Sequence, residues 1–500
     1  MACGSEVSKV HTELANKEMN TNGLEARGGF RQPSTWLALM PVAVLLCAMA
    51  LLIICGGAGA VQDYSPWLLL GTGIVAAATA MIVCRCPLGN LWAGLRKSGS
   101  QIIPSIPILL LIGTVSATWM LSGVVPVLID CGLKVLNPSL FLFTACAICA
   151  VISVLTGSSW TTIATIGVAL MGIGTVMGYS PGWVAGAIIS GAYFGDKLSP
   201  LSDTTVLASS SCGVELFRHI RYMMLTSAPA MVLALGVFAV VGLVGDYGAV
   251  ESRNELAAGL ASTFNLTPWL MVVPAVTGLL IALRVNSYLT LSVSSLLGLG
   301  AMFLFQPQVV EALGGYGVAT GLTVLATSTQ IATGSELLDS LVATGGMEGM
   351  LQTVLLVTCA MVFGGVMIGS GMLRSITEAL TKRIKTPRST VAATVASGLA
   401  LNGYTGDQYL SIILSSNMFR PMYERNALES RLLSRTVEDS VSVTSVLIPW
   451  NSCGLTQATV LGVATLTYLP YCVFNIVSPL MSLGMAWAGI RIRRTIPGHA

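Results

Sequence analysis

The sequence predicts an all-α, polytopic membrane protein in which two inverted-topology repeats contain discontinuous helices. Three observations carry this prediction: the composition, a series of long apolar stretches, and an internal duplication whose copies contain helix-breaking residues. Of the 500 residues, 54% are hydrophobic and only 9% are charged, whereas soluble domains carry roughly 25% charged residues. The mean hydropathy of +0.79 excludes a soluble globular domain.

Several stretches have the length of about 20 mainly apolar residues that a helix needs to cross a bilayer. They are residues 35–59, 66–84, 102–123, 138–156, 222–245, 268–283, 286–305, 350–373 and 467–490. Residues 1–34 mix acids and bases without an apolar core, unlike a signal or transit peptide, so we expect a cytoplasmic tail there.

The expected organisation along the chain follows from these stretches. It comprises an N-terminal tail (1–34), two transmembrane helices (35–100), a first inverted repeat (101–245), connecting transmembrane helices with an outer loop (246–348), a second inverted repeat (349–491) and a cytoplasmic C-terminal tail (492–500).

Basic residues mark the loops expected on the cytoplasmic side. These are Arg27, Arg31, Arg85, Arg96, Lys97, Arg218, Arg221, Arg284, Arg374, Lys382, Arg383, Lys385, Arg388, Arg491, Arg493 and Arg494. Loops poor in bases are expected to face outward, and they carry Asp63, Asp246, Glu251, Glu311, Glu336 and Asp339. Both termini are therefore expected inside. The net charge of +3 lies in these loops, which indicates topology and not a nucleic-acid partner.

The cysteines and histidines predict no metal centre and no cofactor. Cys146 and Cys149 have a metal-like spacing, but they lie inside an apolar stretch without a second pair or a nearby histidine. Most of the other cysteines also lie in or beside apolar stretches, where cysteine behaves as a small hydrophobe.

Four landmarks recur in the same order in the two halves of the chain. Ser122–Gly123 recurs 248 residues later as Ser370–Gly371, Thr156–Gly157 recurs 249 residues later as Thr405–Gly406, Asp196 is paired with Asp439 at 243 residues, and Ser211–Gly213 with Ser452–Gly454 at 241 residues. With the topology above, the stretch at 102–123 runs outward and its counterpart at 350–373 runs inward. The sequence therefore predicts inverted repeats.

Each repeat contains two predicted helix breaks: residues 155–159 and 195–200 in the first, and residues 402–407 and 438–450 in the second. Irregular backbone at membrane depth is tolerated only where it is buried in protein or lines an aqueous cavity. Inverted repeats with matching breaks are typical of secondary transporters, whose substrate and ion sites lie near the bilayer midplane. The breaks therefore predict a transporter cavity.

The stretch GAYFGDKLSPLSDTT at residues 191–205 places Asp196 and Asp203 around Pro200. Proline removes a backbone hydrogen bond and unwinds the preceding turn, which frees carbonyl oxygens beside the carboxylates and the hydroxyls of residues such as Ser199 and Thr204. Carboxylate, carbonyl and hydroxyl oxygens suit a small hard cation. Lys197 is a candidate charge partner that would keep one of the acids ionised.

The second repeat supplies further acids and hydroxyls at its breaks. The candidate ion- and proton-binding residues there are Asp407, Glu438, Asp439, Ser442 and Asn451, with Thr156 and Thr405 at the paired Thr–Gly breaks. Asp196, Asp203, Asp407 and Asp439 are the candidate Na⁺ ligands. The alternative for each acid is a carboxylate at the membrane surface or a structural ion pair, for which Arg435 is placed one turn before Glu438.

A buried carboxylate resists ionisation unless a cation or a hydrogen-bond donor compensates it. Na⁺ and H⁺ can therefore compete for one carboxylate site. Suppose that the site can change its access from one side of the membrane to the other only when it holds Na⁺ or H⁺. The flow of one cation down its gradient then drives the other cation up its gradient.

Four segments resemble the signature segments of the NhaC-type Na⁺/H⁺ antiporter family: the stretch at 191–205, TGDQYLSIIL at 405–414, MFRPMYE at 418–424, and LSRTVEDSVSVTSVLIPWNSCG at 433–454. The resemblance implies a bacterial inner-membrane protein that exchanges Na⁺ for H⁺. It carries the signature acids over to Asp196, Asp203, Asp407, Glu438 and Asp439. One position departs from the family pattern. Asn often follows the Asp-Thr-Thr segment in the family, whereas Val206 follows it in this sequence.

Three other functions are weighed against Na⁺/H⁺ exchange. Some similar proteins exchange malate and protons for lactate and sodium, and such an exchanger needs a cation such as Lys197 or Arg420, or a helix N-terminus, for its carboxylate substrate. Gly195–Asp196 and Gly406–Asp407 superficially resemble the motifs of intramembrane aspartyl proteases, but the duplication and the many hydroxyls do not suit an enzyme. A channel would need rings of filter residues, and no such repeat is present in the sequence.

The expected partners are Na⁺, H⁺ and membrane lipid, with a small carboxylate substrate under the first alternative. The oligomeric state stays open, a homodimer included.

Overall fold

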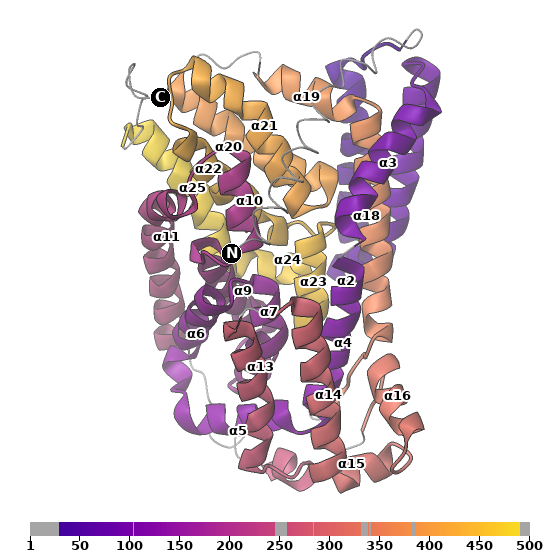
Figure 1. The fold of residues 1–500 in the computed structure, drawn as a ribbon, viewed down its shortest axis with the longest axis vertical. Coiled ribbons are helices and arrows are strands. Elements are labelled where there is room, and N and C mark those ends of the chain that lie inside the picture. The colour runs from indigo at the N-terminus through magenta and orange to yellow at the C-terminus, as the bar shows by residue number, and fades with distance from the viewer. Residues whose placement is uncertain are drawn as a thin grey trace.

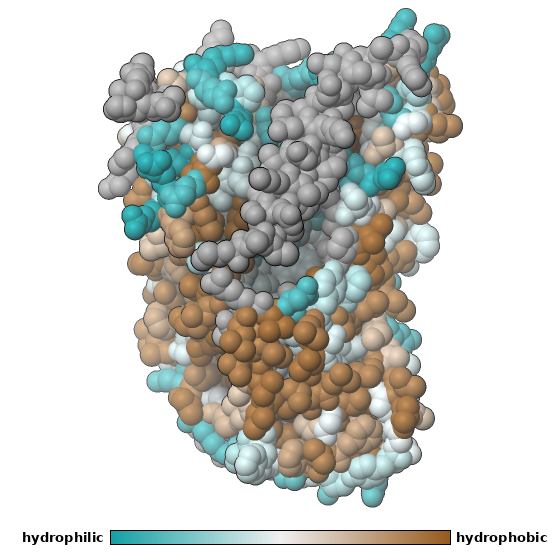
Figure 2. Space-filling view, viewed as in Figure 1, coloured by the Kyte–Doolittle hydropathy of each residue, from teal (hydrophilic) through white to brown (hydrophobic). Residues whose placement is uncertain are grey.

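The computed structural model describes residues 30–103, 105–245, 258–283, 285–331, 339, 342–381 and 386–490. Over these residues the chain forms an elongated bundle of helices, many of which follow its long axis (Figure 1). Seven of the described helices are long and apolar enough to cross a membrane, or up to nine if each of two bent pairs forms one span. Figure 2 shows hydrophobic side chains over the middle and lower part of one face and hydrophilic side chains gathered toward the upper end.

The first half of the described chain contains these α-helices: α2 (Thr35–Val83), α3 (Leu88–Ile102), α4 (Ser105–Leu121), α5 (Val124–Val135), α6 (Phe141–Thr156), α7 (Ser159–Thr162), α8 (Val168–Val176), α9 (Pro181–Leu198), α10 (Asp203–Ser211) and α11 (Leu216–Val244). The connecting region contains α13 (Val272–Ala282), α14 (Ser287–Phe305), α15 (Pro307–Ala312) and α16 (Val318–Ala326).

The second half contains α18 (Leu351–Gly369), α19 (Met372–Thr381), α20 (Pro387–Thr405), α21 (Gln408–Arg425), α22 (Ser430–Val437), α23 (Ser452–Leu461), α24 (Thr465–Tyr468) and α25 (Val473–Ala488). Two short π-helical segments, η3 (Ile163–Gly167) and η6 (Glu438–Ser442), continue α7 and α22 respectively. The other short helices are 3₁₀: η2 (Pro138–Leu140), η4 (Pro268–Met271), η5 (Glu348–Met350), η7 (Ser445–Leu447) and η8 (Leu469–Tyr471).

The predicted spans are largely confirmed. Helix α2 contains the first two, Thr35–Leu52 and Tyr64–Val83. It turns back on itself, since Ser65 Oγ lies 4.0 Å from Met49 Sδ and the Arg31 N–H donates to the Cys84 carbonyl. The stretches expected at 102–123 and 467–490 belong to bent pairs, and the segment at 268–283 is a shorter apolar helix. The span Ser159–Val176 was not predicted from the sequence, because its hydropathy of 1.4 is lower than that of the other spans.

Some sequence predictions lie outside the described residues. They include most of the N-terminal tail, the whole C-terminal tail, the acids Asp246, Glu251 and Glu336, and the bases Arg27, Arg284, Lys382, Arg383, Lys385, Arg491, Arg493 and Arg494.

All four predicted helix breaks are present, but three are shorter or later than the sequence predicted. The first lies between α6 and α7, as expected. The second lies at residues 199–202, because α9 continues through Leu198 and keeps Asp196 helical. The third is limited to Gly406 and Asp407. The fourth lies at residues 448–451, because Glu438 and Asp439 belong to the π-helical segment η6 and not to unwound chain.

The backbone repeats itself at a separation of 249 residues. Gly157, Gly178 and Gly213 have positive φ, and so do the residues 249 positions later, Gly406, Ala427 and Gly462. Helix caps correspond in the same way, since Ser158 and Asp407 cap α7 and α21, and Ser202 and Asn451 cap α10 and α23. Matching local geometry over so long a segment supports the internal duplication.

This register corrects two of the pairings that the sequence predicted. Ser211 ends α10, whereas Ser452 begins α23, so these two residues do not correspond. At the separation of 249 residues, Asp196 corresponds to Ser445 and Asp439 corresponds to Ser190. Short letter matches misled the sequence comparison, whereas turns and caps fix the register through backbone geometry.

The two Ser–Gly breaks lie at opposite ends of the molecule. In Figure 1, α5, which follows Gly123, lies at the lower end, and α19, which follows Gly371, lies at the upper end. This is the arrangement that inversion of the two halves predicts.

Close helix packing holds the second break in place. A Cβ atom on Gly191 of α9 would lie 2.1 Å from the carbonyl oxygen of Cys146 in α6, and one on Gly195 would lie 2.3 Å from the Ala150 oxygen. Such small residues let two membrane helices approach backbone to backbone. Because Gly195 directly precedes Asp196, this contact fixes the position of that carboxylate.

Candidate functional site

The acids Asp196 and Asp203 line one small polar cavity. Its volume is about 90 Å³, enough for a few water-sized groups. It is lined by Ile108, Ile112, Ser158, Trp160, Thr161, Asp196, Asp203, Thr204, Leu291, Gln408 and Tyr409. The polar lining residues lie at, or in the helix ends beside, the breaks between α6 and α7, between α9 and α10, and between α20 and α21. The broken helices therefore meet at this cavity.

Asp196 is 7% exposed, and its two oxygens differ in their surroundings. The Ser159 hydroxyl donates a 2.7 Å hydrogen bond to Oδ2. Oδ1 is buried and has no hydrogen-bond partner among the described residues. A buried carboxylate oxygen without a donor is costly, so Asp196 Oδ1 is the atom of this cavity best placed to receive a cation or a proton.

Asp203 is the first residue of α10 and lies at the more open side of the cavity. The Tyr409 hydroxyl donates a 2.7 Å hydrogen bond to its Oδ2, and the N–H of Thr204 donates to its Oδ1 at 2.9 Å. The tyrosine lies in α21 of the second half, so this bond joins the two halves of the chain at the cavity.

A larger cavity of about 420 Å³ adjoins the first and shares Ile108, Ser158, Thr161, Asp203 and Leu291 with it. Its other lining residues are Thr156, Gly157, Leu201, Val285, Asn286, Tyr288 and Thr290. Among the described residues that line the two cavities, the charged ones are acids only. Together the cavities offer two carboxylates with hydroxyl and amide oxygens, a donor set that suits a hard cation.

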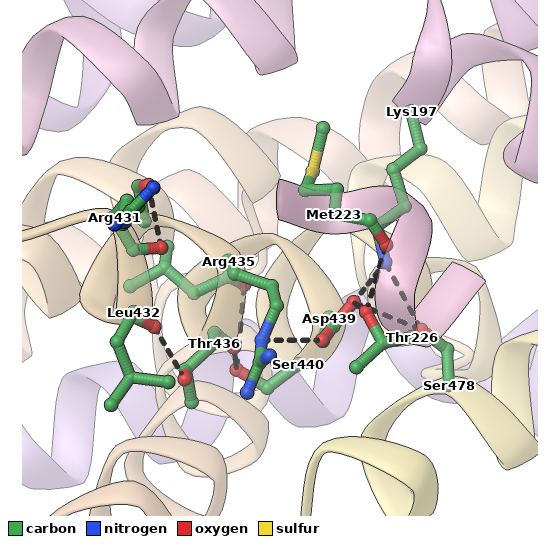
Figure 3. A network of polar contacts seen from close by, with 12 residues as sticks. Lys197, Met223, Thr226, Arg431, Leu432, Arg435, Thr436, Asp439, Ser440 and Ser478 are labelled. Carbon is green, nitrogen blue, oxygen red and sulfur yellow. Dashed lines mark hydrogen bonds and ion pairs between the residues drawn. The ribbon is translucent and has the colours of Figure 1, made fainter. Parts of the chain in front are cut away.

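Lys197 and Asp439 form a buried ion pair, with side chains 1% and 0% exposed. Figure 3 shows Lys197 pointing toward Asp439, with Thr226 and Ser478 beside them. The hydroxyl of Thr226 donates to Asp439 Oδ1 at 3.1 Å, and Lys197 Nζ donates to Ser478 Oγ at 3.1 Å. The predicted role of Lys197 as the charge partner of one acid is consistent with this contact.

Arg435 lies on the other side of Asp439, with its Nε 3.8 Å from Oδ2 (Figure 3). Its guanidinium carbon lies 4.8 Å from the ring centroid of Tyr222, a cation–π contact. Arg435 thus pairs with Asp439, and no ion pair to Glu438 is present within the described chain. Both Glu438 oxygens are buried without a hydrogen-bond partner among the described residues.

Asp407 is buried and serves as the N-cap of α21. Its Oδ1 accepts from the Leu410 N–H at 2.8 Å, and the Ser452 hydroxyl lies 3.5 Å from its Oδ2. Asp407, Glu438 and Asp439 are not among the lining residues of the two cavities. No group of three or more His, Cys, Asp or Glu side chains in the described part of the chain is arranged to hold a metal ion. A single site made by all four predicted aspartates stays a prediction.

The predicted hydroxyl and amide residues also fall into two groups, those that line a cavity and those that do not. Thr204 lines the small cavity and Thr156 lines the larger one. Ser199 accepts from the Leu201 N–H at 3.2 Å, Thr405 bonds the Ser411 hydroxyl at 2.8 Å, and Asn451 caps α23. The carbonyl oxygen of Ser442 accepts a 3.2 Å hydrogen bond from the Gln408 side-chain amide. These four residues stabilise the breaks and do not line either cavity.

Sequence reasoning missed several residues of the site. Ser159, Gln408 and Tyr409 contact the cavity or its acids, and Asn286 lines the larger cavity. Ser159 lay inside a predicted break, and Gln408 and Tyr409 follow Asp407 directly. Their position next to helix breaks was the available signal.

The chain matches the model of the Na⁺/H⁺ antiporter family over residues 33–210 and 191–490. The protein belongs to this family. It is 36% identical over 390 residues to the Na⁺/H⁺ antiporter NhaC of Alkalihalophilus pseudofirmus, which covers 78% of this chain and 83% of that protein. Identity is 33% over 467 residues to the arginine/ornithine antiporter ArcD of Halobacterium salinarum, with 92% and 93% coverage. A malate-2H⁺/Na⁺-lactate antiporter of Bacillus subtilis is 34% identical over 394 residues, with 78% and 82% coverage.

Proposed function

We propose that this protein is a secondary active Na⁺/H⁺ antiporter, and not an enzyme, in which Na⁺ and H⁺ compete for the carboxylates of Asp196 and Asp203. The observation that carries the proposal is the buried Oδ1 of Asp196, which has no hydrogen-bond partner in the described part of the chain, in a cavity that also holds Asp203. Hydroxyls from the first break and Gln408 from the third supply neutral oxygens around it. Its membership of the Na⁺/H⁺ antiporter family supports the same function.

The coupling follows from the charge of the cavity. With neither Na⁺ nor H⁺ bound, the cavity would hold two negative carboxylates, and that of Asp196 is buried, which is a costly state. Binding of Na⁺ or protonation relieves that cost, so the loaded forms are the ones that can change their access from one face to the other. Because the form without Na⁺ or H⁺ does not change its access, each return step must carry one of the two cations, and exchange results.

We further propose that the two halves are inverted repeats. Their movement relative to each other would open the cavity first to one side of the membrane and then to the other. The constant separation of 249 residues and the opposite positions of α5 and α19 support this (Figure 1). Arg85 in a loop and Arg218 and Arg374 in the first turns of α11 and α19 support cytoplasmic termini, whereas Arg96, also predicted in a loop, lies within α3. The bacterial relative NhaC supports a bacterial inner membrane.

An organic-acid antiporter is less favoured. The two sequence candidates for binding its carboxylate are engaged elsewhere, because Lys197 pairs with Asp439 and Arg420 lies 3.4 Å from Glu424 with 51% of its side chain exposed. Two acids in the cavity would repel a carboxylate substrate. Helix N-termini at the cavity offset this repulsion only in part, because Asp203 stands in the first turn of α10.

The test is Na⁺-dependent dissipation of an imposed pH gradient in proteoliposomes that contain only inorganic salts. The wild-type protein should dissipate the gradient, and Asp196→Asn should not. The matched control is Asp130→Asn, because Asp130 pairs with the 71% exposed Lys134 outside the cavities. Undiminished exchange by Asp196→Asn would refute the assignment. Activity that requires added malate, lactate or arginine would instead identify an organic substrate.

A further inference from the structure

A basic cleft lies at the beginning of α11, away from the two cavities. Its volume is about 420 Å³, and it is lined by Glu215, Phe217, Arg218, Arg221, Tyr222, Leu225 and Arg431. Three guanidinium groups therefore face one carboxylate in this cleft. The transport mechanism proposed above uses none of these residues.

The arginines of the cleft differ in their engagement. Arg431 pairs with Glu429, and its guanidinium carbon lies 5.2 Å from the ring centroid of Tyr222. The side chains of Arg218 and Arg221 are exposed and make no ion pair or hydrogen bond with any other described residue. Both also lie in the first two turns of α11, where the helix dipole disfavours cations. An anion in the cleft would relieve this unfavourable arrangement.

The position of the cleft along α11 indicates the kind of anion. The 29 residues of α11 extend about 43 Å at about 1.5 Å per residue, whereas the hydrocarbon core is about 30 Å thick. Arg218 and Arg221 lie at the start of α11 and an apolar run follows to Val244, so the first turns of α11 stand at the depth of the lipid headgroups. Farther along the helix, Val232 and Leu243 are 69% and 65% exposed, as expected for side chains that face acyl chains.

Phe217 is 60% exposed at the cleft, and aromatic rings favour the boundary between acyl chains and headgroups. Guanidinium groups bind phosphate oxygens in a bidentate manner, and basic pockets beside transmembrane helices bind anionic headgroups. We propose that this cleft binds the phosphate of an anionic phospholipid, held by Arg218 and Arg221 with Arg431 behind them.

The experiment measures lipid retention by native mass spectrometry of the full-length protein. Equimolar phosphatidylglycerol and phosphatidylcholine with the same acyl chains are added to the delipidated protein. We expect preferential retention of phosphatidylglycerol, with at least tenfold weaker retention by Arg218→Gln/Arg221→Gln. The matched control is Arg420→Gln, which removes an exposed arginine that already has a carboxylate partner and should leave retention unchanged.

Two results with the wild type and the double Gln variant would overturn the proposal. One is equal retention of phosphatidylglycerol by the double variant and the wild type. The other concerns the melting temperature of the protein: inorganic phosphate alone raises it as much as phosphatidylglycerol does. That result would identify a free anion as the ligand. If the double variant does not fold, Arg218→Lys/Arg221→Lys keeps the charge but loses the guanidinium geometry, and it should weaken retention at least threefold. Unchanged retention by this lysine variant would also count against the site.

Discussion

Asp439 is the centre of a buried charge network, and its substitution gives the sharpest test of the fold. Two cations flank it, Lys197 on one side and Arg435 on the other, and all three side chains are at most 1% exposed. Asp439→Asn would leave both cations in the interior without this counter-charge. Removing one partner of a buried ion pair costs about 3–5 kcal/mol, so we expect a loss of this size in the free energy of unfolding.

Lys197→Met should cost less than Asp439→Asn. In that variant Arg435, whose Nε lies 3.8 Å from Asp439, remains as a counter-charge. The order of the two losses is therefore the prediction, and it follows from the geometry of one anion between two cations. Lys134→Met is the control, because Lys134 is 71% exposed and its loss should produce no measurable change.

The assay is unfolding of the purified protein by SDS in dodecylmaltoside micelles, followed by circular dichroism in Na⁺-free buffer. Two results would contradict a single anion between two cations: Lys197→Met destabilises the protein as much as Asp439→Asn, or Asp439→Asn costs less than about 1 kcal/mol, well below the range for a broken buried pair. An Asp439→Asn variant of normal stability that had lost Na⁺ transport would instead return Asp439 to the predicted set of Na⁺ ligands.

Two further substitutions test the site and its support. Ser159→Ala removes the 2.7 Å hydrogen bond to Asp196. One hydrogen bond contributes about 0.5–1.5 kcal/mol. The apparent Km for Na⁺ in proteoliposomes should therefore rise about twofold to tenfold. Ser210→Ala, whose hydroxyl bonds only its own helix, should leave that Km unchanged, and an unchanged Km for Ser159→Ala would exclude its role. Gly191→Ala places a Cβ 2.1 Å from the Cys146 oxygen, and overpacking of this kind costs about 1–3 kcal/mol. Gly236→Ala, with nothing within 4 Å of the added Cβ, should keep the wild-type melting temperature, and equal melting temperatures for the two variants would contradict the close contact of α6 and α9.

The helix breaks could be predicted because glycine, proline and hydroxyl residues act locally. Thr156–Gly157 and Thr405–Gly406 end helices in both halves, since glycine adopts the left-handed conformation that closes a helix. The extent of each break could not be predicted in the same way. Asp196 and Asp439 stay helical because neighbouring helices pack around them, and such packing leaves no local pattern in the sequence.

The amino-acid sequence by itself determined the membrane class, most of the spans and the candidate acids, because apolar length and rare intramembrane charges are properties of the chain alone. Only the tertiary structure decided where those acids lie and which groups surround them. It brought Asp196 and Asp203 to one cavity with Tyr409 of the other half, and it paired Asp439 with Lys197, 242 residues earlier. The physical reason is that a carboxylate's role depends on which donors and cations lie within a few ångströms, and those neighbours come from distant parts of the chain.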